Sequence, residues 1–286
     1  MSELPASFFA ADPADPERFL PTTLTRGPWD NRAQHGGPPC ALLARSIDAF
    51  ENPTVAPDVQ GPEDELPRVI HSRRGHLTAR LTFGLLRPVP IAPLRVKVEP
   101  QRLGRMVHRI RASLTTDDGT VLVTADALRI RRIRSASSTI ALDAWPAAED
   151  SPPLVFNFFR HAVGYHRGVA LRVAHGAWGR TPIGVWGRLR VPLVEGEPLT
   201  ALQSIVALSD AQSGMGVPLD PLKWTFVNPD LTILMGRDPD PGWVGFDIHS
   251  TAGGDGAGVA ESALRDRLGS LGRAAQTLVV SERMPG

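Results

Sequence analysis

An internal repeat constrains the fold of this chain more than any other feature of its sequence. Arg87 lies in LTFGLLRPVP, and Arg237 lies 150 residues later in the similar stretch LTILMGRDPD. Further matches fall into the same register without a gap: Leu81 with Leu231, Thr82 with Thr232, Gly104 with Gly254, Gly119 with Gly269, Ala125 with Ala275 and Leu128 with Leu278. A fixed period of this kind indicates a repeated structural unit. The 286 residues, a length that allows one large domain or two small ones, therefore predict two copies of one small unit.

Antiparallel strands are predicted in each copy, because apolar and polar residues alternate there with a period of two. In the first copy the alternating stretches are 94–100, 107–116 and 120–132, with turns at 101–105 and 117–119. In the second copy they are 243–252, 258–267 and 272–282, with turns at 253–256 and 268–269. One helix is expected ahead of each group of strands, over 38–50 and over 198–216.

These elements favour the α+β class and a tandem (double) hotdog, in which two antiparallel sheets are each wrapped around a long helix. A long apolar helix beside one antiparallel sheet buries its surface against a face of that sheet. The polar, proline-bearing stretch 137–153 is typical of a linker. We therefore expect an N-terminal unit over 1–136, a linker over 137–153 and a C-terminal unit over 154–286.

Cysteine usage and charge narrow the range of functions. Cys40 is the only cysteine, so a disulfide scaffold and a cysteine-rich zinc site are excluded and a reducing compartment is favoured. The sequence has no run of about 18 apolar residues and no signal-peptide pattern, which favours a cytoplasmic protein. The net charge of +1 conceals a local net charge of +11 between Arg68 and Arg134. One interpretation is a polyanionic partner, which could be nucleic acid or a phosphate-bearing molecule such as coenzyme A. The other is that the arginines are solvated on strand faces.

Several short motifs occur in a fixed order along the chain. The first half contains HGG at His35–Gly37 before ALLARSI, then LLRPVP, RLGR and GTVLVTADALRI. The second half contains VALSDA, FVNPDLTILMGRDP, WVGFDIHS and DRLGSLGRAAQTLVV. In this order, and with the tandem repeat, the chain resembles the acyl-CoA thioesterase II and thioesterase-like proteins, which are double hotdogs. The resemblance implies hydrolysis of a fatty or related acyl-CoA to free acid and coenzyme A, with no metal and no other cofactor, by a homodimer or larger homo-oligomer.

The resemblance also implies a catalytic set of three polar residues: an Asp in the second-half helix, a Thr after it and a Gln on the last strand. These positions correspond to Asp210, Asn228 and Gln276, so this chain has Asn where the family pattern has Thr. A carboxylate can take a proton from water, and a side-chain amide can hydrogen-bond a water or a carbonyl oxygen. At the offset of 150 the counterpart of Gln276 is Asp126, which suggests that only one half holds the working site.

The segment before the first helix is the expected substrate-binding site. The backbone N–H groups of Gly36 and Gly37 lie at a helix N-terminus, where an anion binds favourably, although the two prolines that follow lack such donors. His35 is a candidate base at the same place. Cys40 fits a buried helix position better than a nucleophile, and the remaining histidines lack the spacing of a metal site.

Other functions remain open on the sequence. A non-catalytic function, as an acyl-CoA-binding or lipid-binding hotdog protein, stays possible because Asn228 replaces the family's Thr. An enoyl-CoA hydratase-like enzyme needs an Asp and a His close together, and the stretch after Pro229 has no His. Nucleic-acid binding is disfavoured because aromatic residues do not alternate with the basic ones as stacking platforms would.

Overall fold

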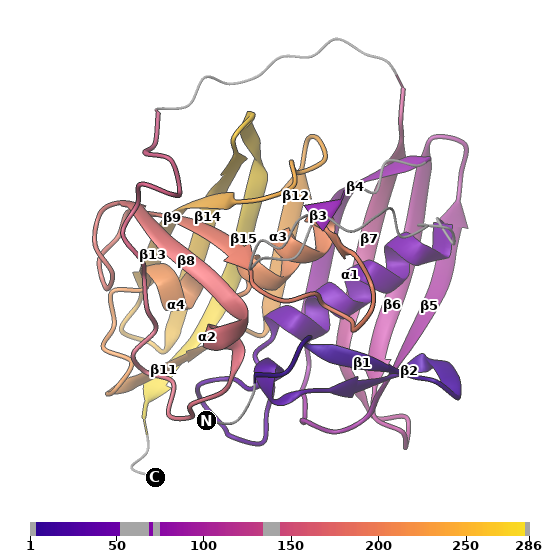
Figure 1. Cartoon of the computed structure of the whole chain (residues 1–286), viewed down its shortest axis with the longest axis horizontal. Helices are drawn as coiled ribbons and strands as arrows, with labels where there is room; N and C mark the ends of the chain where they lie inside the picture. The colour runs from indigo at the N-terminus through magenta and orange to yellow at the C-terminus, as the bar shows by residue number, and fades with distance from the viewer. Residues whose placement is uncertain (1–3, 52–68, 71–74, 134–143, 284–286) are drawn as a thin grey trace.

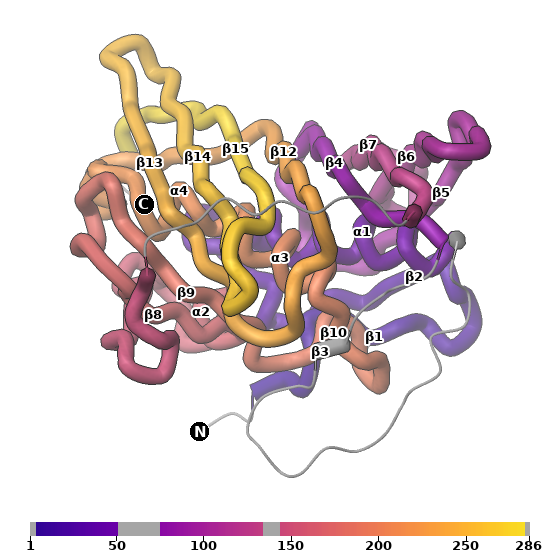
Figure 2. The backbone as a smooth tube through the Cα atoms, turned by 90° about the horizontal axis from the view of Figure 1, so that it is seen from above, coloured from indigo at the N-terminus to yellow at the C-terminus, as the bar shows by residue number. Residues whose placement is uncertain are grey.

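The computed structural model describes residues 4–51, 69–70, 75–133 and 144–283. Within them a large antiparallel sheet of thirteen strands curves around three helices (Figures 1 and 2). The strands of the first half are β1 (Phe9–Asp12), β2 (Asp15–Pro21), β4 (His76–Leu85), β5 (Leu94–Leu103), β6 (Val107–Thr115) and β7 (Val121–Arg131). Those of the second half are β8 (Val169–His175), β9 (Ile183–Leu189), β11 (Trp224–Val227), β12 (Asp230–Met235), β13 (Val244–Ala252), β14 (Ala257–Asp266) and β15 (Gly269–Glu282).

The helices are α1 (Gly37–Glu51), α3 (Ala201–Ser209) and α4 (Gln212–Gly216), with the short α2 (Tyr165–Gly168) and a 3-10 turn, η1 (Thr23–Thr25), at the side. A parallel pair, β3 (Val69–Ile70) with β10 (Leu199–Thr200), forms a separate two-stranded sheet.

The two halves of the large sheet have matching strand orders. The order runs β1-β2-β5-β6-β7-β4 through the first half and returns as β12-β15-β14-β13-β9-β8 through the second. The halves meet where β4 pairs antiparallel with β12, and Thr82 lies opposite Thr232 in that pairing. Residues related by the repeat therefore face each other at the centre of the sheet, as a two-fold relation between the copies requires. The expectation of two separate sheets was wrong, because pairing these two strands covers an edge of each copy and merges the sheets into one.

The register of the repeat changes in the last strand of each half. Ile110 pairs with Ala127 in the first half, and Ala260, 150 residues after Ile110, pairs with Gln276 in the second. The structural counterpart of Gln276 is therefore Ala127, and the predicted match with Asp126 was wrong. The reason is that the connection from Leu264 to its partner Gly272 is one residue shorter than the connection from Leu114 to its partner Val123. A shift of one residue along a strand places each side chain on the opposite face of the sheet.

The first long helix forms as predicted, while the second is broken. Helix α1 covers the expected 38–50 with one further residue at each end. The expected helix over 198–216 was wrong as a single element, because α3 ends at Ser209 and α4 begins at Gln212. The N-terminus of α3 is fixed by a capping box, in which the Thr200 hydroxyl accepts from the Gln203 N–H and the Gln203 side chain accepts from the Thr200 N–H. The break places Asp210 at the C-terminus of α3.

Helices α1 and α3 pack side by side in the concave face of the sheet, in one hydrophobic core shared by both halves (Figure 1). Gly37 allows this contact, since a Cβ there would lie 2.2 Å from the carbonyl oxygen of Ala207. Side chains such as Leu43 and Ile47 of α1 are fully buried, and each burial of this kind stabilises the fold by about 1.5–3 kcal/mol. Of the proposed linker, 137–143 lies outside the described residues, and 144–153 has no helix or strand.

Ion pairs engage arginines of the basic stretch of the first half. Arg95 lies 2.6 Å from Asp15 and 3.1 Å from Asp117, and Arg111 lies 2.9 Å from Asp126. Asp15 lies outside the counted stretch and therefore offsets part of its local charge. This arrangement favours the interpretation of these arginines as partners on strand surfaces over that of a nucleic-acid-binding face.

Candidate active site

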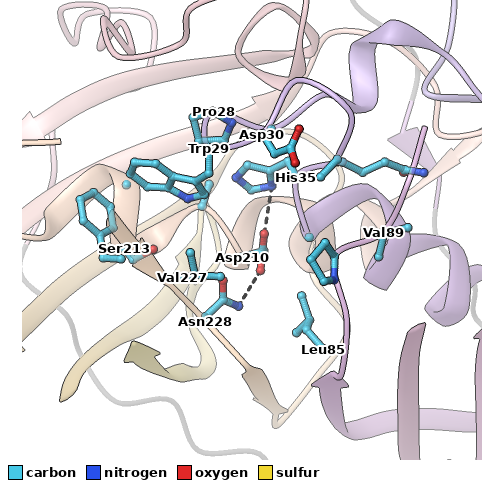
Figure 3. A pocket seen from close by; sticks show the side chains of 18 of the residues that line it. Pro28, Trp29, Asp30, His35, Leu85, Val89, Asp210, Ser213, Val227 and Asn228 are labelled. Atoms are coloured by element: carbon cyan, nitrogen blue, oxygen red, sulfur yellow. Dashed lines mark hydrogen bonds and ion pairs between the residues drawn. The ribbon is translucent and has the colours of Figure 1, made fainter. Parts of the chain in front are cut away.

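Four of the six predicted site residues, His35, Gly36, Asp210 and Asn228, line one pocket of about 450 Å³ at the junction of the two halves (Figure 3). In the first half its walls come from the turn before α1 (27–36) and from the end of β4 with the segment after it (85–89). In the second half they come from the aromatic segment 156–159, the break between α3 and α4, and the end of β11 with the two residues after it (226–229). The two halves thus share the pocket. This placement follows from the packing of the N-terminus of α1 against the C-terminus of α3.

Asp210 occupies the inner wall with both carboxylate oxygens engaged. Its side chain is only 3% exposed. The Asn228 amide donates to Oδ1 at 2.8 Å, and Nδ1 of His35 lies 2.9 Å from Oδ2. A buried carboxylate is costly unless donors compensate for the lost water, and these two side chains supply that compensation. The structure therefore brings together three of the residues that the sequence singled out.

His35 is held flat between Asp210 and Tyr165. Its ring stacks on the Tyr165 ring with 3.8 Å between centroids and 7° between planes. The Tyr165 hydroxyl in turn donates to the carbonyl oxygen of Ala207 at 2.9 Å. The backbone N–H of Gly37 also points at Nδ1 of His35, at 3.1 Å. Nδ1 has a single in-plane site, so it either donates to Asp210 or accepts from Gly37. The Asp210 oxygen is nearer and charged, which favours the tautomer with hydrogen on Nδ1 and leaves the Gly37 N–H without this acceptor.

Two neighbouring groups are kept protonated by this environment. Burial, and after it the negative charge of Asp210, raise the pKa of the Cys40 thiol and the pKa of the Tyr165 hydroxyl well above their usual values. Cys40 is fully buried and remains a thiol, so the structure supports its interpretation as a core residue rather than a nucleophile. Tyr165 likewise acts as a neutral donor.

Close packing leaves no room for a side chain at Gly36 or at Gly37. A Cβ on Gly36 would lie 2.9 Å from each carboxylate oxygen of Asp210 and 2.7 Å from the Leu85 side chain. The two glycines therefore allow the turn to approach Asp210. The N–H of Gly37, expected to meet an anion of the substrate, points instead at His35.

Asn228 uses its amide nitrogen within the protein. Besides Asp210, it donates to the carbonyl oxygen of Asp230 at 3.1 Å. Both amide hydrogens are thereby engaged, and only the amide oxygen is left to accept from a water. Asn228 thus positions Asp210 and can orient a water, but it supplies no donor to a substrate carbonyl.

Gln276 lies outside the pocket lining, in a buried polar network behind α4. Its amide oxygen accepts from Gln212 at 3.1 Å, and the Gln212 oxygen accepts from Ser262 at 2.5 Å. Gln276 is 1% exposed, and its Nε2 has no hydrogen-bond partner among the described residues. Gln212 follows Asp210 by two residues, so the network lies next to the pocket along the chain. Among the described residues, Gln276 makes no hydrogen bond to Asp210 or Asn228.

Sequence reasoning missed the aromatic wall of the pocket and Tyr165. Trp29 stacks on Phe158 at 5.8 Å and meets Phe226 edge to face at 5.0 Å. Phe156 and Phe159 complete the wall. The run FNFF at 156–159 was a signal in the sequence, but its partner Trp29 lies far away along the chain. Tyr165 carried no local pattern that could link it to His35.

The equivalent place in the first half is closed. Thr78, 150 residues before Asn228, lines a cavity of only about 20 Å³ together with Asp48. Arg129 fills this place, donating to Asp48 at 3.0 Å and to the carbonyl oxygen of Ile47 at 3.1 Å. In the second half the counterpart of Arg129 is the apolar Leu278, as the register on either side shows. An open pocket is therefore found at only one of the two related places among the described residues.

Metal and membrane sites have no support in the described part of the chain. No group of three or more His, Cys, Asp or Glu side chains there is arranged to hold a metal ion. No helix there is long and apolar enough to cross a membrane.

Comparisons with known proteins identify the family of this chain. Two family models match in chain order: the acyl-CoA thioesterase N-terminal domain over residues 25–130 and the acyl-CoA thioesterase C-terminal domain over residues 140–280. A search of curated proteins found no match.

Solved structures show the same fold at low sequence identity. A conserved protein with a hot dog fold from Alicyclobacillus acidocaldarius has a TM-score of 0.66 and 18% identity, covering 98% of this chain and 97% of that one. An acyl-CoA thioesterase II from Mycobacterium marinum has a TM-score of 0.62 and 17% identity over 96% of each chain. A tesB protein from Mycobacterium avium subsp. paratuberculosis has a TM-score of 0.61 and 15% identity, over 94% of this chain and 95% of that one.

Proposed function

Because this chain belongs to the acyl-CoA thioesterase family and is a thioester hydrolase, we propose that the pocket beside Asp210 is its active site. Thioester hydrolysis needs an activated water, donors around the reacting carbonyl and a slot for the acyl chain. The observation that carries the proposal is the buried Asp210 carboxylate, held by His35 and Asn228 at the wall of an apolar pocket. A charge at such a place is typical of a catalytic centre.

The aromatic wall supports the placement of the acyl chain. Trp29, Phe158 and Phe226 pack against one another and present ring surface to the pocket that Asp210 lines. An acyl chain laid along these rings leaves water, and its burial is favourable by about 0.8 kcal/mol per CH₂ group. The thioester carbonyl then lies next to the Asp210–His35 pair. This orientation fits a fatty acyl group or a related apolar one.

A neighbouring open pocket supports the placement of the coenzyme A phosphates. This pocket, of about 440 Å³, shares Pro28, Trp29 and Asp30 with the first, and its other lining residues are Asn31, Arg32, Arg160 and His161. Burial, and after it the positive charge of Arg160, lower the pKa of Arg283. The Arg283 guanidinium lies 5.5 Å from the centre of the Trp29 ring. Positive potential therefore gathers at the outer rim of the site, where it attracts a polyanionic cofactor.

Finer features of the fold belong to the same proposal. The matching strand orders and the Thr82–Thr232 pairing support a tandem double hotdog, with units over 1–136 and 154–286. The closed place at Arg129 supports a single active site in the second unit. A homodimer or larger homo-oligomer and a place in lipid metabolism follow from the family resemblance, and a cytoplasmic location stays an expectation from the sequence.

The assay that tests the function measures thiol release from a panel of acyl-CoAs with short, long, branched and aromatic acyl groups. Wild-type protein should release coenzyme A from at least one of them, and Asp210→Asn should lower kcat by about 10²–10⁴-fold. Asp255→Asn, at the exposed turn between β13 and β14, is the matched control. Binding of acyl-CoA without turnover would instead identify a non-catalytic binding protein, and hydration of an enoyl-CoA would identify a hydratase.

A further inference from the structure

The His35–Asp210 pair has one nitrogen, Nε2 of His35, with no hydrogen-bond partner among the described residues. Nδ1 faces Asp210, so Nε2 lies on the opposite side of the ring, and His35 lines the pocket (Figure 3). The His35 side chain is 12% exposed, compared with 3% for Asp210. Its free nitrogen is therefore the basic atom of the pair that a water in the pocket can reach.

The carboxylate itself is poorly placed to take a proton. Both of its oxygens already accept hydrogen bonds, from Asn228 at 2.8 Å and from His35 at 2.9 Å. The carboxylate is also less exposed than the imidazole in front of it, and a carboxylate in that place stabilises the imidazolium. The same arrangement, with the carboxylate buried and the imidazole exposed to substrate, occurs in catalytic triads.

We propose that His35 is the general base of the hydrolysis and that Asp210 is a positioning residue that acts through it. This inference rests on the proposed function, since it assigns the proton transfer at that active site. The flat stacking on Tyr165 and the hydrogen bond to Asp210 fix the ring from two directions. Nε2 then accepts one proton from a water while the water oxygen bonds to the thioester carbon.

The remaining step returns the proton to the leaving group. The tetrahedral intermediate collapses, the carbon–sulfur bond breaks, and the electron pair of that bond goes to the sulfur of coenzyme A. The imidazolium gives its Nε2 proton to this thiolate. The products are the carboxylic acid and the free thiol, His35 is regenerated as the neutral Nδ1–H tautomer, and no other reactant is consumed.

Among the described residues, Asp210 is the charged side chain that contacts the His35 ring. Tyr165 from α2 and Cys40 from α1 are neutral, because burial and the charge of Asp210 raise the pKa of each. Asp30 and Arg87, of opposite charge, also line the pocket. The test of the assignment therefore has to follow the His35 ring itself as well as the rate.

His35→Gln tests the assignment, because an amide can still donate to Asp210 but cannot take up the proton. We expect kcat to fall by about 10²–10⁴-fold, KM to change by less than about threefold and the acid limb of the pH profile of kcat/KM to disappear. In the wild type, the midpoint of that limb should coincide with the titration of His35 followed by NMR on ¹⁵N-histidine-labelled protein, with Nδ1 carrying the hydrogen at high pH. His175→Gln, which removes an Asp–His contact of 3.3 Å outside the pocket, should leave all these readouts unchanged.

The outcomes separate the failure of this inference from that of the function. If the wild type hydrolyses acyl-CoA and His35→Gln retains activity within about threefold, or loses activity but keeps the acid limb at the same midpoint, His35 is not the base. A ¹⁵N spectrum with hydrogen on Nε2 would also overturn the assignment, even for an inactive preparation. If the wild type releases no thiol from any acyl-CoA, the proposed function fails and the role of His35 fails with it. Circular dichroism and thermal unfolding confirm that each variant is folded.

Discussion

The amide nitrogen of Asn228 lies 2.8 Å from Oδ1 of Asp210, although the two residues come from different elements of the second half. Asp210 is the C-cap residue directly after α3, and Asn228 lies between β11 and β12. The break in the predicted helix makes the contact possible, because it leaves the carboxylate at a helix end instead of along a buried face. The Asn that departs from the family pattern therefore still contacts the carboxylate.

Replacing Asn228 tests how much this hydrogen bond contributes. Asn228→Ala removes a donor to a buried carboxylate, and we expect kcat to fall by about 10- to 100-fold, the equivalent of the ~1.5–3 kcal/mol of a hydrogen bond to a charged group. Asn228→Thr can donate once through its hydroxyl and should retain more activity than the alanine variant. Steady-state kinetics on the best acyl-CoA measure both. Equal rates for the alanine variant and the wild type would show that the contact has no catalytic role.

Gly36→Ala should disturb the site by a purely steric route. The new Cβ would lie 2.9 Å from the Asp210 oxygens, so the carboxylate or the turn must move. We expect a fall in kcat and a loss of about 1–3 kcal/mol in the free energy of unfolding, as for other overpacked sites. Gly254→Ala is the control, since its Cβ would meet nothing within 4 Å. Unchanged kcat in Gly36→Ala would mean that the geometry around Asp210 tolerates displacement.

Arg160→Ala should weaken binding of coenzyme A without affecting the chemistry. We expect KM for acyl-CoA to rise by up to about tenfold at low salt, with kcat unchanged, because a positive charge at the rim attracts the phosphates. The same variant should leave KM unchanged for an acyl-N-acetylcysteamine thioester, which carries no phosphate. Arg109→Ala, an exposed arginine of β6, serves as the control. An equal rise in KM for both thioesters would place the effect at the acyl end of the site.

The buried ion pair of the first half should contribute to stability and not to turnover. Arg129 is fully buried and bonded to Asp48, so Arg129→Met leaves a buried carboxylate without this partner. We expect the free energy of unfolding to fall by about 3–5 kcal/mol, measured by urea denaturation, with kcat of the folded protein unchanged. Arg111→Met breaks an exposed pair with Asp126 and should cost at most about 1 kcal/mol. Similar losses for the two variants would contradict the contrast in burial.

Acid should destabilise the fold partly through His166. Burial, with the charge of Arg167, lowers the pKa of His166 to about 4 from its usual 6.5. The folded state therefore binds this proton less readily than the unfolded state, and stability falls as the pH decreases from about 6.5 to 4. His166→Gln should show a smaller loss of stability over this range than the wild type, as measured by thermal unfolding at a series of pH values. Parallel curves for the two proteins would show that other groups cause the loss.

The sequence predicted local structure better than register and remote contacts. Alternation and turn residues located the strands from β5 to β7 and from β13 to β15, and the local sequence pattern located α1, because these signals act over a few residues. Asp210 and Asn228 were expected together, and they meet. The counterpart of Gln276 in the first half was predicted one residue away from its observed position. A difference of one residue in a connection reverses the face to which a strand residue points, and it leaves little trace in the sequence pattern. The stacking of His35 on Tyr165 depends on how α2 packs beside η1 and the turn that follows it, which no local pattern encodes.

The most direct measurement is a crystal structure of Asp210→Asn with a non-hydrolysable thioether analogue of an accepted acyl-CoA. The acyl chain should lie against Trp29 and Phe158, with the carbon that replaces the thioester carbonyl near Nε2 of His35 and the phosphates over Arg160. An analogue bound elsewhere, with this pocket left empty, would contradict the assignment of the active site.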